Sequence, residues 1–265
     1  MDCTVGKIAQ IIEKIAPLDQ AEEWDNVGLM LGRMDMPVKR LMTTVDITSL
    51  VVKEAIDNRI DMIISHHPLI FKPLYSLRED SAAGRIIYPL IENGIAVYCA
   101  HTNLDKAVGG TDDALAESLE LKAIRRLDDT TSGSSFGRIG ILEQPMDIIQ
   151  FAEKVCKLLK AQRIDIAGKR EKQVKTVAVA GGAGAGIMKK ALTSGADVLV
   201  TGEIKHHEAI EAELLGVPVL AAGHFFTELP VMVRLIDRLQ MMLDSLQYNI
   251  DITLSKLQKS PYVSI

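Results

Sequence analysis

Six histidines are the residues of this chain whose types and spacing could do chemistry. They fall in four short stretches, which are His66-His67, His101, His206-His207 and His224. Each stretch follows an apolar, strand-like segment, and carboxylates accompany the histidines at these segment ends. Neutral imidazole together with carboxylate suits zinc, manganese or iron. A lone histidine of this kind is more often structural, but the set predicts a metal site.

The adjacent pair His66 and His67 sits inside the segment IISHHPLIF. Neighbouring side chains of a strand point to opposite faces, so we expect that these two imidazoles cannot easily serve one ion. Pro68 keeps His67 extended and helps to end the strand. The pair is therefore predicted to serve two ions, which Asp105 and Glu228 could bridge, as in two-metal sites with ions roughly 3.5–4 Å apart.

The elements that must position these residues alternate between strand and helix, which favours βαβ units and a largely parallel sheet. The predicted fold class is therefore α/β. Strand-like segments lie at 41–47, 60–65, 95–100, 138–142, 174–182, 197–202, 217–223 and 249–255. Helical segments lie at 8–15, 49–58, 82–94, 147–161, 186–195, 205–216 and 229–246.

The two halves of the chain resemble each other. Asp61 aligns with Asp197 at an offset of 136 residues, and His101 and Asp105 align with His224 and Glu228 at an offset of 123. Sites in open α/β sheets form at the carboxyl ends of strands. We therefore predict two similar α/β lobes with a dinuclear metal site in the cleft between them, although chance similarity of two βαβ units stays open.

The expected boundary between the lobes is the Ser-, Thr- and Gly-rich stretch Asp128–Gly137. The first lobe then covers residues 1–127 and the second covers residues 128–224. A C-terminal helix and strand, residues 225–265, are expected to return to the first lobe.

Composition narrows the class of protein. The 265 residues are 48% hydrophobic and 25% charged, with a net charge of −5 that argues against a nucleic-acid binder. We find no apolar run of the roughly 20 residues that a membrane helix needs, and the opening MDCTVGKIAQ has no signal-peptide core. Three cysteines without a CxxC pair predict a cytoplasmic protein whose metal ligands are not cysteines.

Several ordered motifs resemble the dinuclear metal-centre family named GTP cyclohydrolase I type 2, which includes YbgI-like proteins. The motifs are AEEWDNVGLMLG, VDIT, SHHPLIF, AHTNLDKAVGG, TGEIKHHEA and GHFFTE. The resemblance implies two divalent ions per chain (zinc, iron or manganese) and a two-lobed protomer in a ring-shaped homohexamer. It also implies that the chain is a compact form without the long insert of some members. The implied metal ligands are His66, His67, Asp105, His224 and Glu228.

The resemblance implies a hydrolase acting on a nucleotide or other small molecule, with GTP as the candidate substrate. The net charge and the lack of a long apolar run predict no nucleic-acid or membrane partner. In that scheme His101 is the catalytic proton carrier. Glu203, His206 and His207 could line the same cavity, and the amides of residues 181–186 could contact a phosphate. Two alternatives stay open: a metal-dependent phosphoesterase, and a metal-binding regulatory scaffold without turnover.

Overall fold

The computed structural model describes residues 3–127 and 136–264, so most of the expected boundary stretch Asp128–Gly137 lies outside the described residues. The chain divides into two compact units. The first consists of Met1–Ala107 and Met232–Lys259, and the second of Val108–Val231 and Ser260–Ile265. These limits differ from the lobe limits expected at residues 127 and 224, and the division of the chain into domains stays a prediction.

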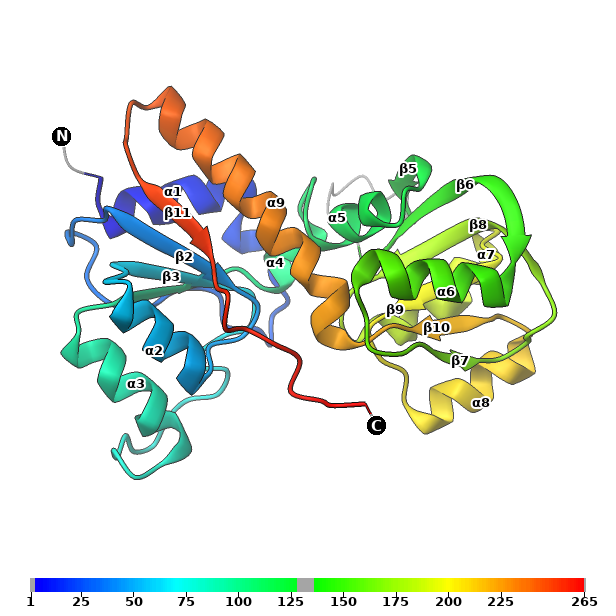
Figure 1. The fold of residues 1–265 in the computed structure, drawn as a ribbon, viewed down its shortest axis with the longest axis horizontal. Coiled ribbons are helices and arrows are strands. Elements are labelled where there is room, and N and C mark those ends of the chain that lie inside the picture. Colours follow the sequence, from blue (N-terminus) through cyan, green and yellow to red (C-terminus); the bar gives the residue numbers. More distant parts are fainter. Residues whose placement is uncertain (1–2, 128–135, 265) are drawn as a thin grey trace. The chain divides into compact units, whose positions relative to one another are not determined.

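The first unit is built on a five-stranded sheet in the order β1-β4-β3-β2-β11 (Figure 1). Only β1 runs antiparallel to its neighbour, because the other three strand pairs are parallel. The carboxyl ends of β2, β3 and β4 therefore meet at one edge of this sheet. The strands are β1 (Gly28–Leu31), β2 (Arg40–Thr44), β3 (Met62–Ser65), β4 (Ala96–Cys99) and β11 (Asp251–Leu254).

Helices cover both faces of this first sheet. On one face α2 and α3 pack against Met42, Ile63 and Val97 of the three central strands. On the other side lie α1 and the later turns of α9 (Figure 1). The helices that contribute to this unit are α1 (Val5–Ile15), η1 (Leu18–Gln20), α2 (Ser49–Asp57), α3 (Ala82–Glu92), α4 (Thr102–Lys106) and α9 (His224–Ser245).

The second unit has a six-stranded sheet in the order β5-β6-β8-β9-β10-β7. Only β8, β9 and β10 are parallel to one another, since β5, β6 and β7 join the sheet antiparallel. The expectation of a largely parallel sheet therefore fails for the outer strands here. The strands are β5 (Lys122–Arg126), β6 (Arg138–Asp147), β7 (Asp165–Ala167), β8 (Gln173–Ala180), β9 (Val198–Thr201) and β10 (Val219–Ala221).

Alternation along β8 divides the core of the second unit into two layers. Val177 and Val179 face the layer that contains α5 and α6, whereas Ala178 and Ala180 face the layer with α7 and α8. The valines fill space against the larger helices and the alanines let the other pair approach closely. The helices are α5 (Thr111–Ser118), α6 (Ile148–Leu159), η2 (Gly184–Ile187), α7 (Met188–Thr193) and α8 (His206–Leu215).

Asp61 and Asp197, which the internal alignment pairs, have the same role in their own units. Oδ2 of Asp61 accepts hydrogen bonds from the backbone N–H groups of residues 39 and 40, at 2.7 and 2.8 Å. Oδ2 of Asp197 accepts from the N–H groups of residues 175 and 176, at 3.0 and 2.8 Å. Asp61, just before β3, thus holds the backbone at the beginning of β2, and Asp197, just before β9, holds the backbone of β8. In both units the two strands are parallel neighbours, which supports the alignment of the two halves.

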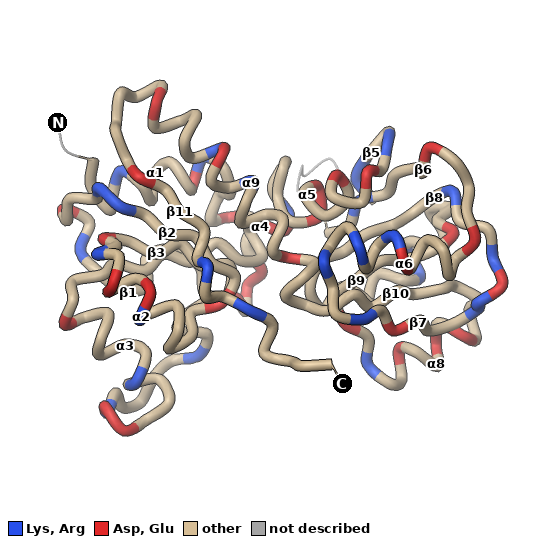
Figure 2. Tube along the Cα trace, in the orientation of Figure 1, with Lys and Arg blue, Asp and Glu red and all other residues tan. Residues whose placement is uncertain are grey.

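Charged residues of both signs are interspersed along the trace of each unit (Figure 2), and over the whole chain they sum to a net charge of −5. Within residues 3–127 and 136–264, no helix combines the length and the apolar character that a bilayer crossing requires.

Candidate metal centre

His66 and His67 lie immediately beyond β3, where they extend its pairing with β2. The backbone N–H of His66 donates to the carbonyl oxygen of Thr44, and that of His67 donates to Val45, both at 3.0 Å. The two rings nevertheless do not point to opposite faces, because their centroids are only 5.2 Å apart. The expectation from strand alternation is wrong here, since the regular strand ends at Ser65 and alternation no longer applies.

Three imidazoles of the first unit hold their Nδ1 atoms against oxygen acceptors. The pairs are His66 Nδ1 with Ala100 O at 2.9 Å, His67 Nδ1 with Asp46 Oδ1 at 2.7 Å, and His101 Nδ1 with Asp25 Oδ1 at 2.9 Å. Carbonyl and ionised carboxylate oxygens only accept hydrogen bonds, so each Nδ1 must carry the proton. The ring lone pair then lies on Nε2. This is the arrangement by which proteins orient histidines that bind metals.

The same three rings converge. One ring nitrogen from each of His66, His67 and His101 lies within 4.8 Å of the other two. His101 stands 5.3 Å from His66 and 5.5 Å from His67 between ring centroids. The three rings thus form one group of nitrogen donors that could hold a metal ion.

Asp105 joins this histidine cluster from α4, which begins directly after His101. Its Oδ1 lies 3.4 Å from Nε2 of the fully buried His66. Among the described residues this buried oxygen accepts no hydrogen bond. A buried carboxylate oxygen without such a donor is costly unless a cation is near it. The position of Asp105 therefore fits a ligand to a metal ion.

Asp25 is the electrostatic support of His101. Burial alone would raise the pKa of the Asp25 carboxyl, but hydrogen bonds from His101 and Thr102 outweigh it and lower the pKa to about 2. Thr102 contributes both its backbone N–H, at 3.1 Å, and its hydroxyl, at 2.5 Å. Asp25 consequently stays ionised at neutral pH and fixes the tautomer of His101.

The second unit holds the other two predicted ligands on the first turns of α9. Nε2 of His224 lies 3.1 Å from Oε1 of Glu228, which is four residues later and thus one turn along the helix. Nδ1 of His224 lies 3.3 Å from Oε2 of Glu203. The backbone of Gly182 (φ +57°) passes so close that a Cβ there would collide with Glu228 Oε1 and lie 3.0 Å from His224 Nε2. Close backbone approach explains why glycine occupies this position.

The remaining sequence candidates have other surroundings. His206 and His207 are exposed at the first residues of α8. The glycine-rich loop does not offer a full set of amides to a phosphate, because the N–H groups of Gly181, Gly182 and Gly184 donate to Asp112, Thr227 and Thr201. These amides thus tie the loop to α5, α9 and β9.

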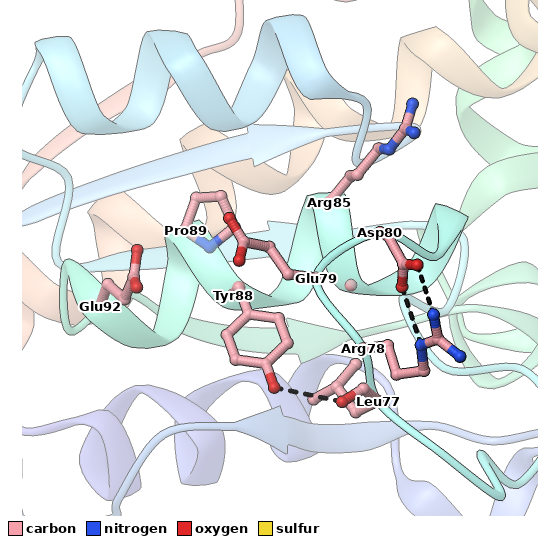
Figure 3. Close-up of a pocket in the computed structure, with 9 residues that line it drawn as sticks. Leu77, Arg78, Glu79, Asp80, Arg85, Tyr88, Pro89 and Glu92 are labelled. Carbon is pink, nitrogen blue, oxygen red and sulfur yellow. Dashed lines mark hydrogen bonds and ion pairs between the residues drawn. The ribbon is translucent and has the colours of Figure 1, made fainter.

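A separate hollow of about 750 Å³ lies on α3 and the segment before it (Figure 3). Arg78 forms two hydrogen bonds to Asp80, and the Tyr88 hydroxyl donates to the carbonyl oxygen of Leu77 at 3.1 Å. Its lining contains none of the histidines, so it is not the candidate centre. It consists of Leu77, Arg78, Glu79, Asp80, Gly84, Arg85, Tyr88, Pro89 and Glu92.

The donor set fits a divalent metal with nitrogen and oxygen ligands. Neutral imidazoles with orienting acceptors and a buried carboxylate are both present in the first unit, and a histidine–glutamate pair is present in the second. The nearby Cys99 thiol donates to the His66 carbonyl oxygen at 3.0 Å, and burial raises its pKa well above the ordinary value. Cys99 therefore remains a protonated thiol that supports the backbone of His66.

Comparison with known proteins identifies the family of this chain. Residues 3–261 match the model of the family described as Duf34/NIF3 (NGG1p interacting factor 3), and the chain belongs to this family. A Clostridium acetobutylicum protein named "GTP cyclohydrolase 1 type 2 homolog" is 33% identical over 265 residues, with 99% of each chain covered. The solved structure of a Bacillus cereus protein related to NIF3 has a TM-score of 0.95 and 27% identity, with both chains fully covered.

Another relative differs in length. A Halalkalibacterium halodurans protein with the same name as the clostridial one is 26% identical over an alignment of 365 residues, which covers 97% of this chain and 98% of that protein. The alignment is longer than the present chain of 265 residues. That relative therefore has additional residues that this chain lacks.

Sequence reasoning missed the acceptors that orient the rings, above all Asp25 and Asp46. Asp46 follows β2 at the same sheet edge as the histidines, so the rule that sites form at strand ends could have found it. Asp25 lies 76 residues before His101, and only its place in the motif AEEWDNVGLMLG pointed to it. Glu203 was weighed only as a residue that could line the site.

Proposed function

We propose that this protein is a dinuclear-metal-dependent hydrolase. The observation that carries the proposal is the cluster of His66, His67 and His101, whose Nδ1 atoms are all bonded to oxygen acceptors while one nitrogen from each ring converges within 4.8 Å. Such orientation is typical of histidines that bind a metal, as proposed for His66 and His67, and of histidines that transfer protons beside it, as proposed for His101. The buried Oδ1 of Asp105 supports the same reading.

The proposed centre holds two divalent ions of zinc, iron or manganese. Neither unit alone supplies enough donors for two ions, so we propose that the histidine cluster of the first unit and the His224–Glu228 pair of the second complete one site in the cleft between them. Carboxylates would bridge the ions, as they do in other two-metal sites. The proposed ligands are His66, His67, Asp105, His224 and Glu228.

A bound pair of divalent ions supplies Lewis acidity that activates water for attack near neutral pH. The chain's own contribution is proton transfer at Nε2 of His101, while its Nδ1–H stays bonded to the ionised Asp25 carboxylate. The carboxylate stabilises the positive charge that the ring acquires when Nε2 takes up a proton. His101 is thus proposed as the catalytic residue.

The substrate is proposed to be a nucleotide or another small molecule, and the names of the relatives make GTP the first candidate. We further propose a cytoplasmic homohexamer. Light scattering would then give six times the 29.0 kDa of one chain. A monomer at micromolar concentration would remove the hexamer from the proposal and leave the metal centre untouched.

Metal analysis tests the proposal directly. The purified chain, reloaded with zinc, iron or manganese and freed of excess metal, should contain about two ions per protomer. Replacement of any proposed ligand by alanine should lower that content, whereas His206→Ala should leave it unchanged. A content of one under excess metal would contradict the dinuclear centre.

Activity is tested separately on the loaded protein, with GTP and a panel of phosphoesters. If the loaded protein turns over GTP, and if His101→Ala lowers this turnover while its metal content stays the same, the result supports a GTP hydrolase. Turnover of phosphoesters but not of GTP would support a metal-dependent phosphoesterase in place of a GTP hydrolase. Metal binding with no turnover of any substrate would favour a regulatory scaffold.

A further inference from the structure

Trp24 and Phe71 form an exposed aromatic pair in the first unit. Trp24 is 61% exposed and Phe71 is 46% exposed. Their ring centroids are 6.0 Å apart with an angle of 70° between the planes, so they meet edge to face. Large apolar rings left in contact with water at a defined geometry are typical of binding surfaces.

Backbone and side-chain hydrogen bonds hold these two rings in place. Asn26, two residues after Trp24, donates a hydrogen bond from Nδ2 to the carbonyl oxygen of Ile70 at 2.5 Å. Ile70 directly precedes Phe71. Asp25, the residue between Trp24 and Asn26, is fixed by hydrogen bonds from His101 and Thr102. The segments that carry the two rings are thus joined to each other and to the histidine cluster, so little freedom is lost when a ligand binds.

The aromatic pair adjoins the candidate metal centre. The centroid of Trp24 is 6.4 Å from that of His101, and the planes make an angle of 76°. Phe71 and His101 both meet the indole edge to face, so neither ring is stacked in parallel on Trp24. A planar ring placed against Trp24 would bring the rest of the same molecule toward His101.

We infer that Trp24 and Phe71 form a platform that binds the planar aromatic ring of the substrate. The inference rests on the proposed function in one respect, that the reacting part of this molecule lies at the histidine cluster. Stacking on an aromatic side chain tolerates many heterocycles, because every such ring has a π-face. The platform therefore selects a class of substrate, namely small molecules that carry an aromatic heterocycle.

The chain contains one tryptophan, so its fluorescence reports on Trp24 alone. We would titrate the full chain, as purified and again after metal reloading, with adenosine monophosphate and with ribose 5-phosphate. These probes share sugar and phosphate and differ only in the ring. Adenosine monophosphate should change the emission and bind, by calorimetry, on the order of 10-fold or more tightly than ribose 5-phosphate.

Variants assign the difference to the platform. Trp24→Ala and Phe71→Ala should each weaken adenosine monophosphate on the order of 10-fold and leave ribose 5-phosphate unchanged, and Trp24→Phe should restore part of the affinity. Tyr75→Ala is the matched control, because Tyr75 is a fully exposed aromatic residue in the segment after Phe71. Equal binding of the two probes, or equal binding to Trp24→Ala and to the unaltered chain, would overturn the inference.

One rival occupant has its own result. If a second copy of the chain covers Trp24 and Phe71, Trp24→Ala lowers the mass of the assembly in light scattering without a change in nucleotide affinity, and the platform is refuted. Metal content, measured on the same samples, is independent of these titrations. A chain that binds two ions but no ring refutes only the platform, and one that binds the ring but no metal refutes only the metal centre.

Discussion

The carboxylate of Asp25 accepts a hydrogen bond from Nδ1 of His101 across 2.9 Å, although 76 residues separate the two in the chain. Asp25 Oδ2 also accepts from the backbone and hydroxyl of Thr102. One buried carboxylate therefore fixes a ring of the histidine cluster and the beginning of α4 together. Its ionisation links the site to the stability of the first unit.

The depressed pKa of Asp25 predicts how that stability changes with pH. The carboxyl takes a proton near 3.8 when unfolded and near 2 in the folded protein, so its stabilisation is present above about pH 4 and lost as pH falls toward 2. Asp25→Asn should cost about 2 kcal/mol in the free energy of unfolding at pH 7 and pH 5. Urea denaturation of the metal-free protein at pH 3 should give a smaller difference, by about 1 kcal/mol. A difference that stays constant from pH 7 to pH 3 would contradict this assignment.

Asp46 is expected to control metal affinity through His67. Its Oδ1 lies 2.7 Å from His67 Nδ1, and acceptors in this position typically contribute 10- to 100-fold to metal affinity. Asp46→Ala should therefore weaken zinc binding about 10-fold or more in a competition titration with a chelator. Asp57→Ala is the control, because Asp57 is an exposed carboxylate that forms an ion pair with Lys53 on the same helix. Equal affinities of the two variants would show that Asp46 does not orient His67.

Gly182 should tolerate no side chain. A Cβ at this position would collide with Glu228 and approach His224, and the left-handed φ of +57° adds about 1–2 kcal/mol of strain. Gly182→Ala is expected to lower the metal content of the purified protein. Gly186→Ala in the same loop should be neutral, because a Cβ there meets no atom within 4 Å. Loss of metal from both variants would point to a general effect on the loop.

Glu54 is predicted to be a main support of the C-terminal segment. This buried carboxylate accepts hydrogen bonds from Ser255 Oγ at 2.5 Å and from the N–H groups of Lys256 and Leu257 at 2.8 and 3.1 Å. Glu54→Ala should cost about 3 kcal/mol, since one buried hydroxyl and two part-buried N–H groups lose a charged acceptor at once. Amide hydrogen exchange at β11 is the measurement that checks it, and protection of residues 251–257 should fall first. If protection of these residues is unchanged, the pairing of β11 with β2 holds this segment without help from Glu54.

Long, strongly periodic segments were predictable from sequence. The helix expected at 147–161 contains α6, whose apolar residues lie on one face, and the alternating segment 249–255 contains β11. The long C-terminal helix begins earlier than expected, at His224 rather than residue 229. Proline is typical of a first helical turn, so a start at residue 229 agrees with Pro230 at the second helical position. In the structure Pro230 lies in the second turn of α9, where it removes one hydrogen bond without ending the helix.

Short edge strands and long-range contacts could not be predicted in the same way. β5, with the sequence KAIRR, is mostly exposed and charged, which suits an edge strand but hides its period. At the site, residue types and strand ends pointed to the histidines and to Asp105. Asp25 escaped because a hydrogen bond across 76 residues leaves no local pattern. Asp46 follows β2 and could have been found, but the strand-end rule was applied only to the histidines and their nearest carboxylates.

The return of β11 to β2 has a consequence for synthesis on the ribosome. The first unit takes its last strand from residues 251–254, yet residues 108–231, the larger part of the second unit, are translated before that strand appears. Translation adds about 5–20 residues per second, whereas strands and helices form in microseconds. The nascent first sheet must therefore wait for seconds with β2 as an open edge, to which other chains could add. Chaperone dependence during translation, absent once the chain is released, is the expected cellular signature of this topology.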